Sequence, residues 1–442
     1  MESDSFASLV QLILKAVKPS TLAVLTISIL WEKLIEEEER FSPSLKKRKE
    51  PRMSMWWTEF WIDEAGLYTS GTAYQLKRFR HRFRLSKPAL VKLVALVREW
   101  LPFVGKPDCT RRSGAPIELL VMGSLAILGR VVTFEILEDV TFISSTTHRR
   151  FFELFCSTCS TKLFEWYVKP PQNEDELKSA MQPFIDVGLP GAFCATDGVR
   201  VRMWNCSYNL KHQNFGKEGY TARVFQAHVG CNGKFFSCTD GFDGNQNDAG
   251  IVKEDAFIDL VRRHDLFKNV KWEYMDKDGN VKEKFGAWIL VDSGYPDINI
   301  LQCPPPFAYS LAGKRLQRIM ESARKDIERA FGILKKRFPM LKFGFTIQNY
   351  SLMNSIFKTC VALHNFLLTE ESEVTILSVN LEEREDIFEN VYLPLKRQFE
   401  LESKPRTLRG LNAKSPEYLA FRTPCHQFQP EIRNGASGRI DK

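Results

Sequence analysis

The chain has 442 residues, 44% of them hydrophobic and 12% aromatic, which is enough length for two or three domains and excludes a wholly disordered polymer. Its net charge is +8 and its ten cysteines are irregularly spaced, a pattern typical of reduced intracellular thiols rather than a disulfide framework. Neither a phosphate-binding P-loop nor a Gly-x-Ser-x-Gly nucleophile motif occurs, so ATP-driven chemistry and the α/β-hydrolase mechanism have no support.

Residues 1–75 are expected to form an N-terminal extension that is partly disordered. The apolar stretch 9–31 is interrupted by Lys15, Lys18 and Pro19, and its uninterrupted part is too short to span a bilayer of about 30 Å. We therefore expect no membrane segment there. The basic run 46–49 resembles a nuclear import signal, although short basic runs are frequent by chance.

Residues 76–165 are predicted to be a helical, DNA-binding region. Apolar residues at helical spacing predict one helix from about Leu90 to Leu101, capped by Ser86, and a second from Pro116 to Leu128. Residues 76–150 contain 14 Lys and Arg against six Asp and Glu, so this segment carries as much net charge as the whole chain. Such a block is typical of phosphate-backbone binding, and the alternative is a solvated basic face.

The end of this region has the shape of a helix-turn-helix. One helix is predicted over 134–140, a tight turn passes through Phe142, and Ser144 caps a helix that runs to about Phe155. Arg149 and Arg150 would be displayed on the second helix, where they could contact DNA. An ordinary helical hairpin remains the alternative, because the turn lacks the glycine often found there.

Residues 190–368 are predicted to form an α/β domain with a mixed sheet and flanking helices. The alternation of apolar and polar residues predicts three strands, and a short apolar run predicts a fourth, buried strand. These strands are expected at 193–203, 220–229, 234–240 and 288–291, with helices at 248–263, 321–338 and 352–368. Residues 369–442 show no clear period and are expected to be a partly disordered tail.

Three acids in this domain lie on separate elements. Asp197 is on the first strand, Asp292 ends the buried strand, and Glu328 is in the following helix. Phosphodiester cleavage with two metal ions needs carboxylates that converge from separate segments, and such ligands suit Mg²⁺ or Mn²⁺. Singly, each acid could instead be a turn residue, a cap or a member of a helical ion pair.

The motifs around these acids resemble the catalytic domain of the PIF/Harbinger transposases, a group of DDE superfamily endonucleases that includes Harbinger-derived nucleases. The matching positions are Asp197-Gly198, Gly219-Tyr220, Gly244, Asp248, Asp292-Ser293-Gly294-Tyr295, Ala323-Arg324, Ile327-Glu328-Arg329, Phe331-Gly332, Leu334-Lys335, Arg337-Phe338 and Leu363-His364-Asn365-Phe366. The 35 residues between Asp292 and Glu328 are the separation that this family shows. The resemblance implies an RNase H-like fold in which the three acids are catalytic and bind metal.

The resemblance also has departures. Asn247 stands where the family has His, Glu218 stands where it has Lys, and the family's Asn-x-x-His-Ser segment is replaced at 318–322. These changes leave the three acids intact but make the role of Asp248 uncertain. Residues 79–165 are similar to the family's N-terminal helix-turn-helix region, whereas residues 1–75 and 369–442 lie outside the resemblance.

Basic residues surround Glu328 on its helix. We expect these cations to meet a phosphate backbone near the metal ions, and the alternative is a solvated basic face. They are Arg324, Arg329, Lys335, Lys336 and Arg337.

Three other motifs are better explained structurally. Asp276 begins a segment like a calcium-binding loop, but its twelfth position is Ala287, so a polar hairpin turn is expected. The close pair Cys156 and Cys159 lacks a second pair at zinc spacing. His212, His228 and His364 are isolated in the sequence, which favours structural hydrogen bonding.

The leading hypothesis is thus a Mg²⁺- or Mn²⁺-dependent endonuclease and strand-transfer enzyme acting on double-stranded DNA. The resemblance implies a Myb-like DNA-binding partner and action in the nucleus, with presence in the cytoplasm and homo-oligomer formation left open. The main alternative is a host-recruited DNA-binding protein that keeps the fold without transposition, and a third hypothesis is a protein-interaction scaffold.

Overall fold

The structure is a computed structural model that describes residues 50–106, 114–275, 280–305 and 309–371. The basic run 46–49, the apolar stretch 9–31 and almost all of the predicted tail lie outside the described residues. The chain divides into two compact units, Met1–Ser54 and Met55–Lys442. In the first, Pro51–Met53 forms a short 3-10 helix, η1. Among the residues described, no helix is both long and apolar enough to cross a bilayer.

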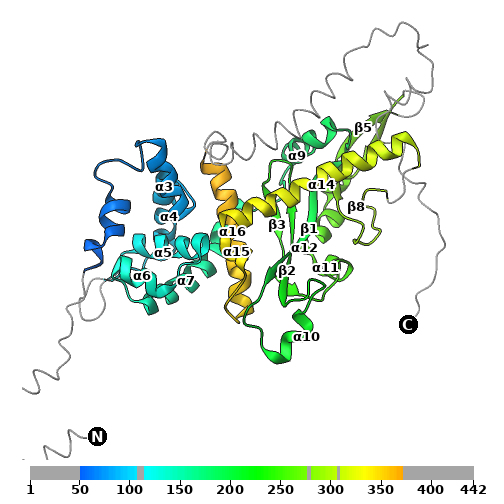
Figure 1. Ribbon diagram of the computed structural model, residues 1–442. Coiled ribbons are helices and arrows are strands. Elements are labelled where there is room, and N and C mark those ends of the chain that lie inside the picture. Colours follow the sequence, from blue (N-terminus) through cyan, green and yellow to red (C-terminus); the bar gives the residue numbers. More distant parts are fainter. Residues whose placement is uncertain (1–49, 107–113, 276–279, 306–308, 372–442) are drawn as a thin grey trace, which may run out of the picture. The chain divides into compact units, whose positions relative to one another are not determined.

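Helices make up the first part of the second unit (Figure 1). They are η2 (Trp56–Ile62), α3 (Ala73–Phe83), α4 (Lys87–Trp100), α5 (Ile117–Arg130), α6 (Phe134–Thr141), α7 (Ser145–Thr158), η3 (Cys159–Leu163), α8 (Phe164–Tyr167) and α9 (Glu174–Asp186). The side chain of Ser86 caps α4 and that of Ser144 caps α7, as the sequence predicts. Phe142 ends α6 in the left-handed conformation, with φ of 59°, a role usually taken by glycine.

This helical part begins earlier in the chain than residue 76, where the sequence placed its start. Trp56, Phe60 and Tyr68 are buried in the same core as Phe79 and Phe83 of α3. The Phe60 ring lies 5.5 Å from that of Phe83 and 5.2 Å from that of Tyr68. The aromatic stretch has no regular period, so only its packing shows that it belongs to the fold.

The helices η2, α3, α4 and α7 pack on α5, which is buried over nearly its whole length. Gly123 in its middle faces His148 of α7, and a Cβ atom there would lie 2.9 Å from the imidazole ring. The glycine thus allows the two helices to approach closely. His148 in turn shares a hydrogen bond of 2.8 Å with Thr141 of α6, and burial lowers the pKa of His148 to about 4.

A mixed sheet follows, with the strand order β3-β2-β1-β7-β8. Its strands are β1 (Ala192–Arg202), β2 (Ala222–Val229), β3 (Phe235–Cys238), β7 (Trp288–Leu290) and β8 (Leu301–Gln302), with β4 (Phe242–Asp243) paired to β2. The first three strands are antiparallel, and β7 and β8 run parallel to β1. The predicted meander and buried fourth strand are therefore confirmed, whereas the two-residue β8 is too short to show a sequence pattern.

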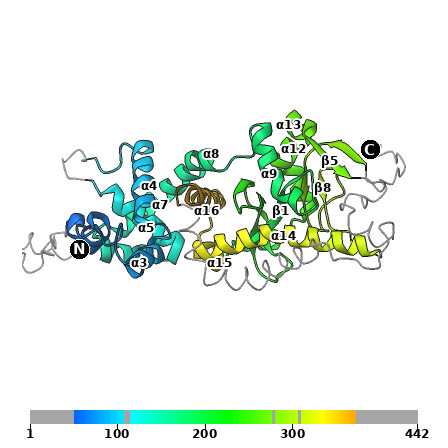
Figure 2. The same ribbon diagram turned by 90° about the horizontal axis from the view of Figure 1, so that it is seen from above.

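Helices cover both faces of this sheet (Figure 2). On one face lie α14 (Leu311–Arg337), α15 (Pro339–Phe343) and α16 (Tyr350–Glu370), which pack on β1, β2 and β3. On the other lie α9, α12 (Ala256–Arg263) and α13 (Asp265–Asn269), which Figure 2 labels, and α11 (Asp248–Glu254), which shares their core. The two cores lie on opposite faces of the sheet: Ala195 and Leu290 belong to the core beneath α14, whereas Phe193 and Ile289 belong to the core beneath α12. Phe193 and Ala195 are only two residues apart, so β1 departs from regular alternation here, next to the register irregularity between Ala192 and Cys194.

Two details differ from the sequence-based expectation. The helix predicted over 248–263 is two helices, because Asp255 adopts an extended conformation and its side chain caps α12. The short helices η4 (Tyr208–Leu210) and α10 (Lys211–Asn214) were not predicted. The expected polar hairpin has flanking strands β5 (Lys271–Met275) and β6 (Val281–Phe285) that pair as predicted, while its turn at 276–279 lies outside the described residues.

Candidate functional site

Strand register places Asp197 beside Asp292. Ala195 of β1 pairs with Leu290 of the parallel strand β7, so residues two positions further along each strand are neighbours on the same face. On β1 this residue is Asp197, while the corresponding residue Asp292 lies in the loop just after β7, where its charge still acts on the Asp197 carboxyl. The Asp197 carboxylate points toward α14, because its Oδ2 atom lies 3.6 Å from the guanidinium of Arg324.

Glu328 reaches the same place from α14. Its neighbour Ile327 is fully buried against the sheet, which fixes this turn of the helix over β1. Arg324, one turn earlier, connects the acids: its guanidinium lies 2.7 Å from Glu328 Oε1 and 3.6 Å from Asp197 Oδ2. The sequence predicted Arg324 as a DNA-contacting cation, but in the structure its side chain is 21% exposed and paired with these two carboxylates.

The electrostatics of Asp197 show that negative charge converges here. The pKa of Asp197 is raised to about 6, mainly by burial and also by the charges of Asp292 and Glu328. The Gly198 amide, which donates a hydrogen bond of 2.8 Å to Oδ1, and the Arg324 guanidinium lower the pKa without offsetting the rise. Asp197 is therefore held in a site that resists further negative charge.

A fourth acid, Asp248, lies at this edge of the sheet. It is the first residue of α11, which the side chain of Asn247 caps with a hydrogen bond of 2.8 Å to the Gly250 amide. A Cβ atom on Gly294 would lie 2.9 Å from Asp248 Oδ2 and 3.1 Å from Asp292 Oδ1. The close approach of the two carboxylates to this loop thus depends on the glycine at position 294. Asn247, for its part, stabilises the start of α11.

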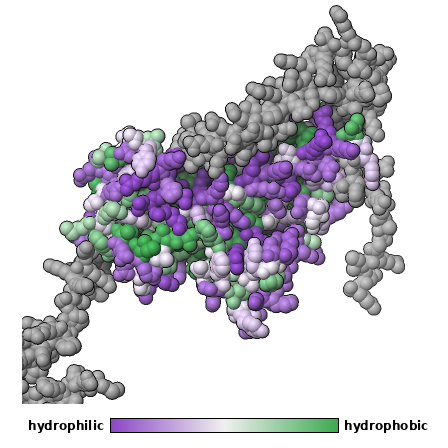
Figure 3. All heavy atoms as spheres, in the orientation of Figure 1, coloured by the Kyte–Doolittle hydropathy of each residue, from purple (hydrophilic) through white to green (hydrophobic). Residues whose placement is uncertain are grey.

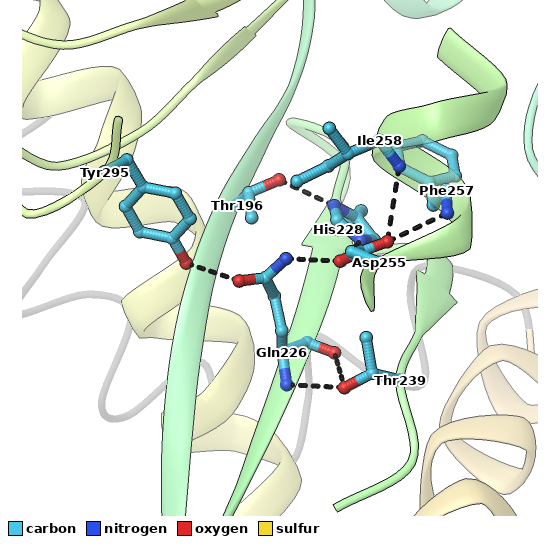
Figure 4. A network of polar contacts seen from close by, with 8 residues as sticks. All are labelled: Thr196, Gln226, His228, Thr239, Asp255, Phe257, Ile258 and Tyr295. Atoms are coloured by element: carbon cyan, nitrogen blue, oxygen red, sulfur yellow. Dashed lines mark hydrogen bonds and ion pairs between the residues drawn. The ribbon is translucent and has the colours of Figure 1, made fainter. Parts of the chain in front are cut away.

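A buried polar network lies on the other face of β1 and β2, where Thr196 pairs with His228 (Figure 4). Thr196, next to Asp197, is 2.6 Å from His228 Nδ1, and His228 Nε2 is 3.0 Å from Asp255. The Gln226 amide donates to the same carboxylate, and Tyr295, three residues after Asp292, donates a hydrogen bond of 2.9 Å to Gln226.

This network connects the strand that carries Asp197 to the loop that carries Asp292. Burial alone would raise the pKa of Asp255, but the charge of His228 and the hydrogen bonds from His228 and Gln226 hold it below its usual value. His228 thus makes the structural hydrogen bonds that the sequence suggested. The network itself was missed, although the pairing of Thr196 with His228 across β1 and β2 could have suggested it.

The motif at 363–366 also has a structural role. The Asn365 side chain accepts a hydrogen bond from the Phe235 amide and donates to the carbonyls of Phe235 and Tyr167. His364 is fully buried, with its Nε2 atom 3.1 Å from the Gly233 carbonyl oxygen. These residues secure the edge strand β3 to α16 and lie outside the acid cluster. Cys156 and Cys159 are likewise buried thiols, and burial raises the pKa of each.

The remaining predicted cations differ in placement. Arg149 and Arg150 are exposed on α7, with the Arg149 guanidinium 4.8 Å from the centre of the Phe134 ring. On α14, Arg329 forms an ion pair with Asp326, and Lys335 donates to the Arg200 carbonyl at 3.2 Å. Lys336 also lies in α14.

The donor set has the chemistry of a divalent-cation site, since hard cations prefer carboxylate oxygens. Across the described residues, however, no three His, Cys, Asp or Glu side chains are already close enough to hold a metal ion together. Arg324 stands between Glu328 and Asp197 and neutralises part of their charge. A cation could be held by all three acids after Arg324 leaves this position.

The comparisons with known proteins agree at a coarse level. Residues 165–375 match the family model of a plant transposon protein, which supports a transposase-related family. No match to the chain was found among the curated proteins or among the solved structures.

Proposed function

We propose that this protein is a metal-dependent DNA endonuclease of the DDE transposase kind, with Asp197, Asp292 and Glu328 as its metal-binding acids. The proposal is supported by the pairing of β1 with β7, which brings Asp197 near the loop that holds Asp292, and by Arg324, whose guanidinium contacts both Asp197 and Glu328. The match to a plant transposon protein over the same residues supports it independently.

The fold supports the proposal at the level of topology. Three antiparallel strands are followed, after intervening helices, by strands parallel to the first, which suits the RNase H-like sheet implied by the PIF/Harbinger resemblance. By the same resemblance we propose double-stranded DNA as the substrate, the nucleus as the place of action and a Myb-like protein as a partner.

Each residue then has a chemical role. When bound, Mg²⁺ or Mn²⁺ would stabilise charge on the attacking and leaving oxygens of a phosphodiester. Asp197 and Asp292 would hold the ions from the sheet and Glu328 from the helix. Arg324 would exchange its carboxylate partners for a phosphate oxygen of the substrate, because a guanidinium pairs with either group in the same geometry. The network behind the sheet would keep the two aspartates in register.

Plasmid nicking tests this proposal. We expect the full chain to nick supercoiled DNA with Mg²⁺ or Mn²⁺ and to lose about 100-fold or more of that rate in Asp292→Asn, because a ligand to the ions is removed. Asp297→Asn, an exposed acid in the same segment, is the matched control and should nick at the wild-type rate. Equal nicking by Asp292→Asn and wild type would exclude the catalytic assignment.

A second function, DNA binding without cleavage, is favoured by the pairing of Arg324 with the acids that would bind metal. In that case the guanidinium is a permanent counter-ion and the wild type is inactive with either metal. Salt-sensitive DNA binding that persists in Asp292→Asn, together with no nicking by the wild type, would support this alternative.

A further inference from the structure

An open hollow of about 300 Å³ lies in the helical part of the protein, on elements other than those that carry the acids. Its walls come from one face of α3 and from the last residue of α5. The lining residues are Tyr74, Lys77, Arg78, His81, Arg82 and Arg130. Hydrophilic side chains predominate on the surface over α3 in this view (Figure 3).

The hollow is held in shape by contacts around it. The side chain of Thr72 forms a capping box with Gln75 at the start of α3. At the other end of the helix, Arg84 donates a hydrogen bond of 2.7 Å to the Gly129 carbonyl, which brings the end of α5 and therefore Arg130 next to α3. The opposite face of α3 is anchored in the core by Phe79 and Phe83.

Positive charge in this hollow is poorly compensated. Only Arg78 of its cations has a carboxylate partner among the described residues, Glu59 at 3.1 Å. Arg82 is packed with its guanidinium 4.7 Å from the centre of the buried Phe60 ring, so its charge is fixed in place. Arg78 and Arg82 are four residues apart on the helix, where like charges repel.

The titration behaviour agrees with that crowding. Burial lowers the pKa of Arg82, and the charges of Arg130 and Arg78 lower it further. Burial and the charges of Arg84, Arg130 and Arg82 likewise lower the pKa of His81. An anion that enters the hollow would reduce the repulsion among these cations.

We propose that this hollow binds a backbone phosphate of double-stranded DNA, as a contact separate from the acids and from Arg149 and Arg150. The proposal rests on the proposed function for its choice of DNA. The walls are side-chain cations around an open mouth, with Tyr74 75% exposed at the rim, which suits a phosphate that is part of a larger surface. Lys and Arg are also the side chains that most often contact the DNA backbone.

DNA binding by the full chain in EDTA tests this assignment. We compare wild type with Lys77→Gln/Arg130→Gln by fluorescence anisotropy of a labelled short duplex, between about 50 and 200 mM salt. Losing one phosphate contact should lower the slope of log affinity against log salt by about 1, and we expect at least about tenfold weaker binding. Arg262→Gln/Arg263→Gln removes the same charge from exposed residues of α12 and should bind within about twofold of wild type.

Three results would overturn the assignment. One is an unchanged affinity and salt slope in the Lys77/Arg130 variant, and another is an equal loss in the α12 control, which would indicate net charge alone. The third is binding of inorganic tripolyphosphate that the variant loses while its DNA affinity stays at the wild-type value, which would assign the hollow to a free polyphosphate. Equal thermal unfolding midpoints of the two double variants would confirm that both are folded.

The test is independent of cleavage, because EDTA removes divalent metal ions. A wild type that fails to nick plasmid but shows hollow-dependent DNA binding would refute the proposed nuclease function and leave this assignment standing. Conversely, a Lys77→Gln/Arg130→Gln variant that nicks normally at saturating DNA, with its affinity reduced, would show that the hollow contributes binding and not chemistry.

Discussion

At the scale of single residues, the main finding is a conflict between stability and function at Asp197. Burial and two neighbouring acids disfavour its charge, and a nearby guanidinium compensates only in part. Groups with strongly shifted pKa values are common at functional sites, where charge is concentrated for a purpose. The raised pKa of Asp197 is consistent with the proposed cation site, because a bound cation would stabilise its charged form.

Asp197→Asn should therefore stabilise the folded protein at neutral pH. With a folded-state pKa of about 6 against the ordinary 3.8, the carboxyl favours folding below pH 4, and this contribution is lost as the pH rises through 6. Removing the charge should raise the free energy of unfolding at pH 7 by about 1–3 kcal/mol, with the gain shrinking towards pH 4. Urea denaturation at both pH values measures this. A variant less stable than wild type at pH 7 would show that the charge is compensated.

At the scale of elements, the loop after β7 and the start of α11 are in close contact through Gly294. Gly294→Ala would place a Cβ atom against the carboxylates of Asp248 and Asp292, so one of them must move. We expect nicking to fall by about tenfold or more, since small displacements of catalytic groups are costly, while the unfolding midpoint changes little because Gly294 is exposed.

Gly332→Ala in α14 is the matched control. Nothing lies within 4 Å of its added Cβ atom, and alanine in place of glycine should stabilise the helix by about 0.5–1 kcal/mol. If the two alanine variants nick equally well, the loop does not constrain the acids.

At the scale of the whole molecule, the sequence predicted the major elements but not how they meet. Alternation located β1 and β2, and cap residues such as Ser86 and Ser144 located helix starts, because these signals are local. The helix α9 was missed because it contains Pro183, and the split at Asp255 was missed because it depends on that side chain's own hydrogen bonds.

For the candidate site, too, local motifs were predictable from the sequence and contacts between distant elements were not. The three acids could be named from their motifs, and their meeting follows from strand register, which periodicity alone does not determine. The inward position of Arg324 could not be predicted, because the same helix face is equally compatible with cations that point to solvent. The network from Thr196 to Tyr295 joins elements far apart in the chain and likewise has no sequence signal.

The central claim, that acids from β1, the loop after β7 and α14 bind one set of divalent ions, is tested most directly by calorimetric titration of the full chain with Mn²⁺. At neutral pH the wild type and Asp297→Asn should bind equally, while Asp292→Asn and Glu328→Gln should bind at least about tenfold more weakly. Binding should also weaken as the pH falls through 6, because the proton on Asp197 must be displaced. Equal Mn²⁺ affinity in all four proteins, or no binding by the wild type, would contradict this account.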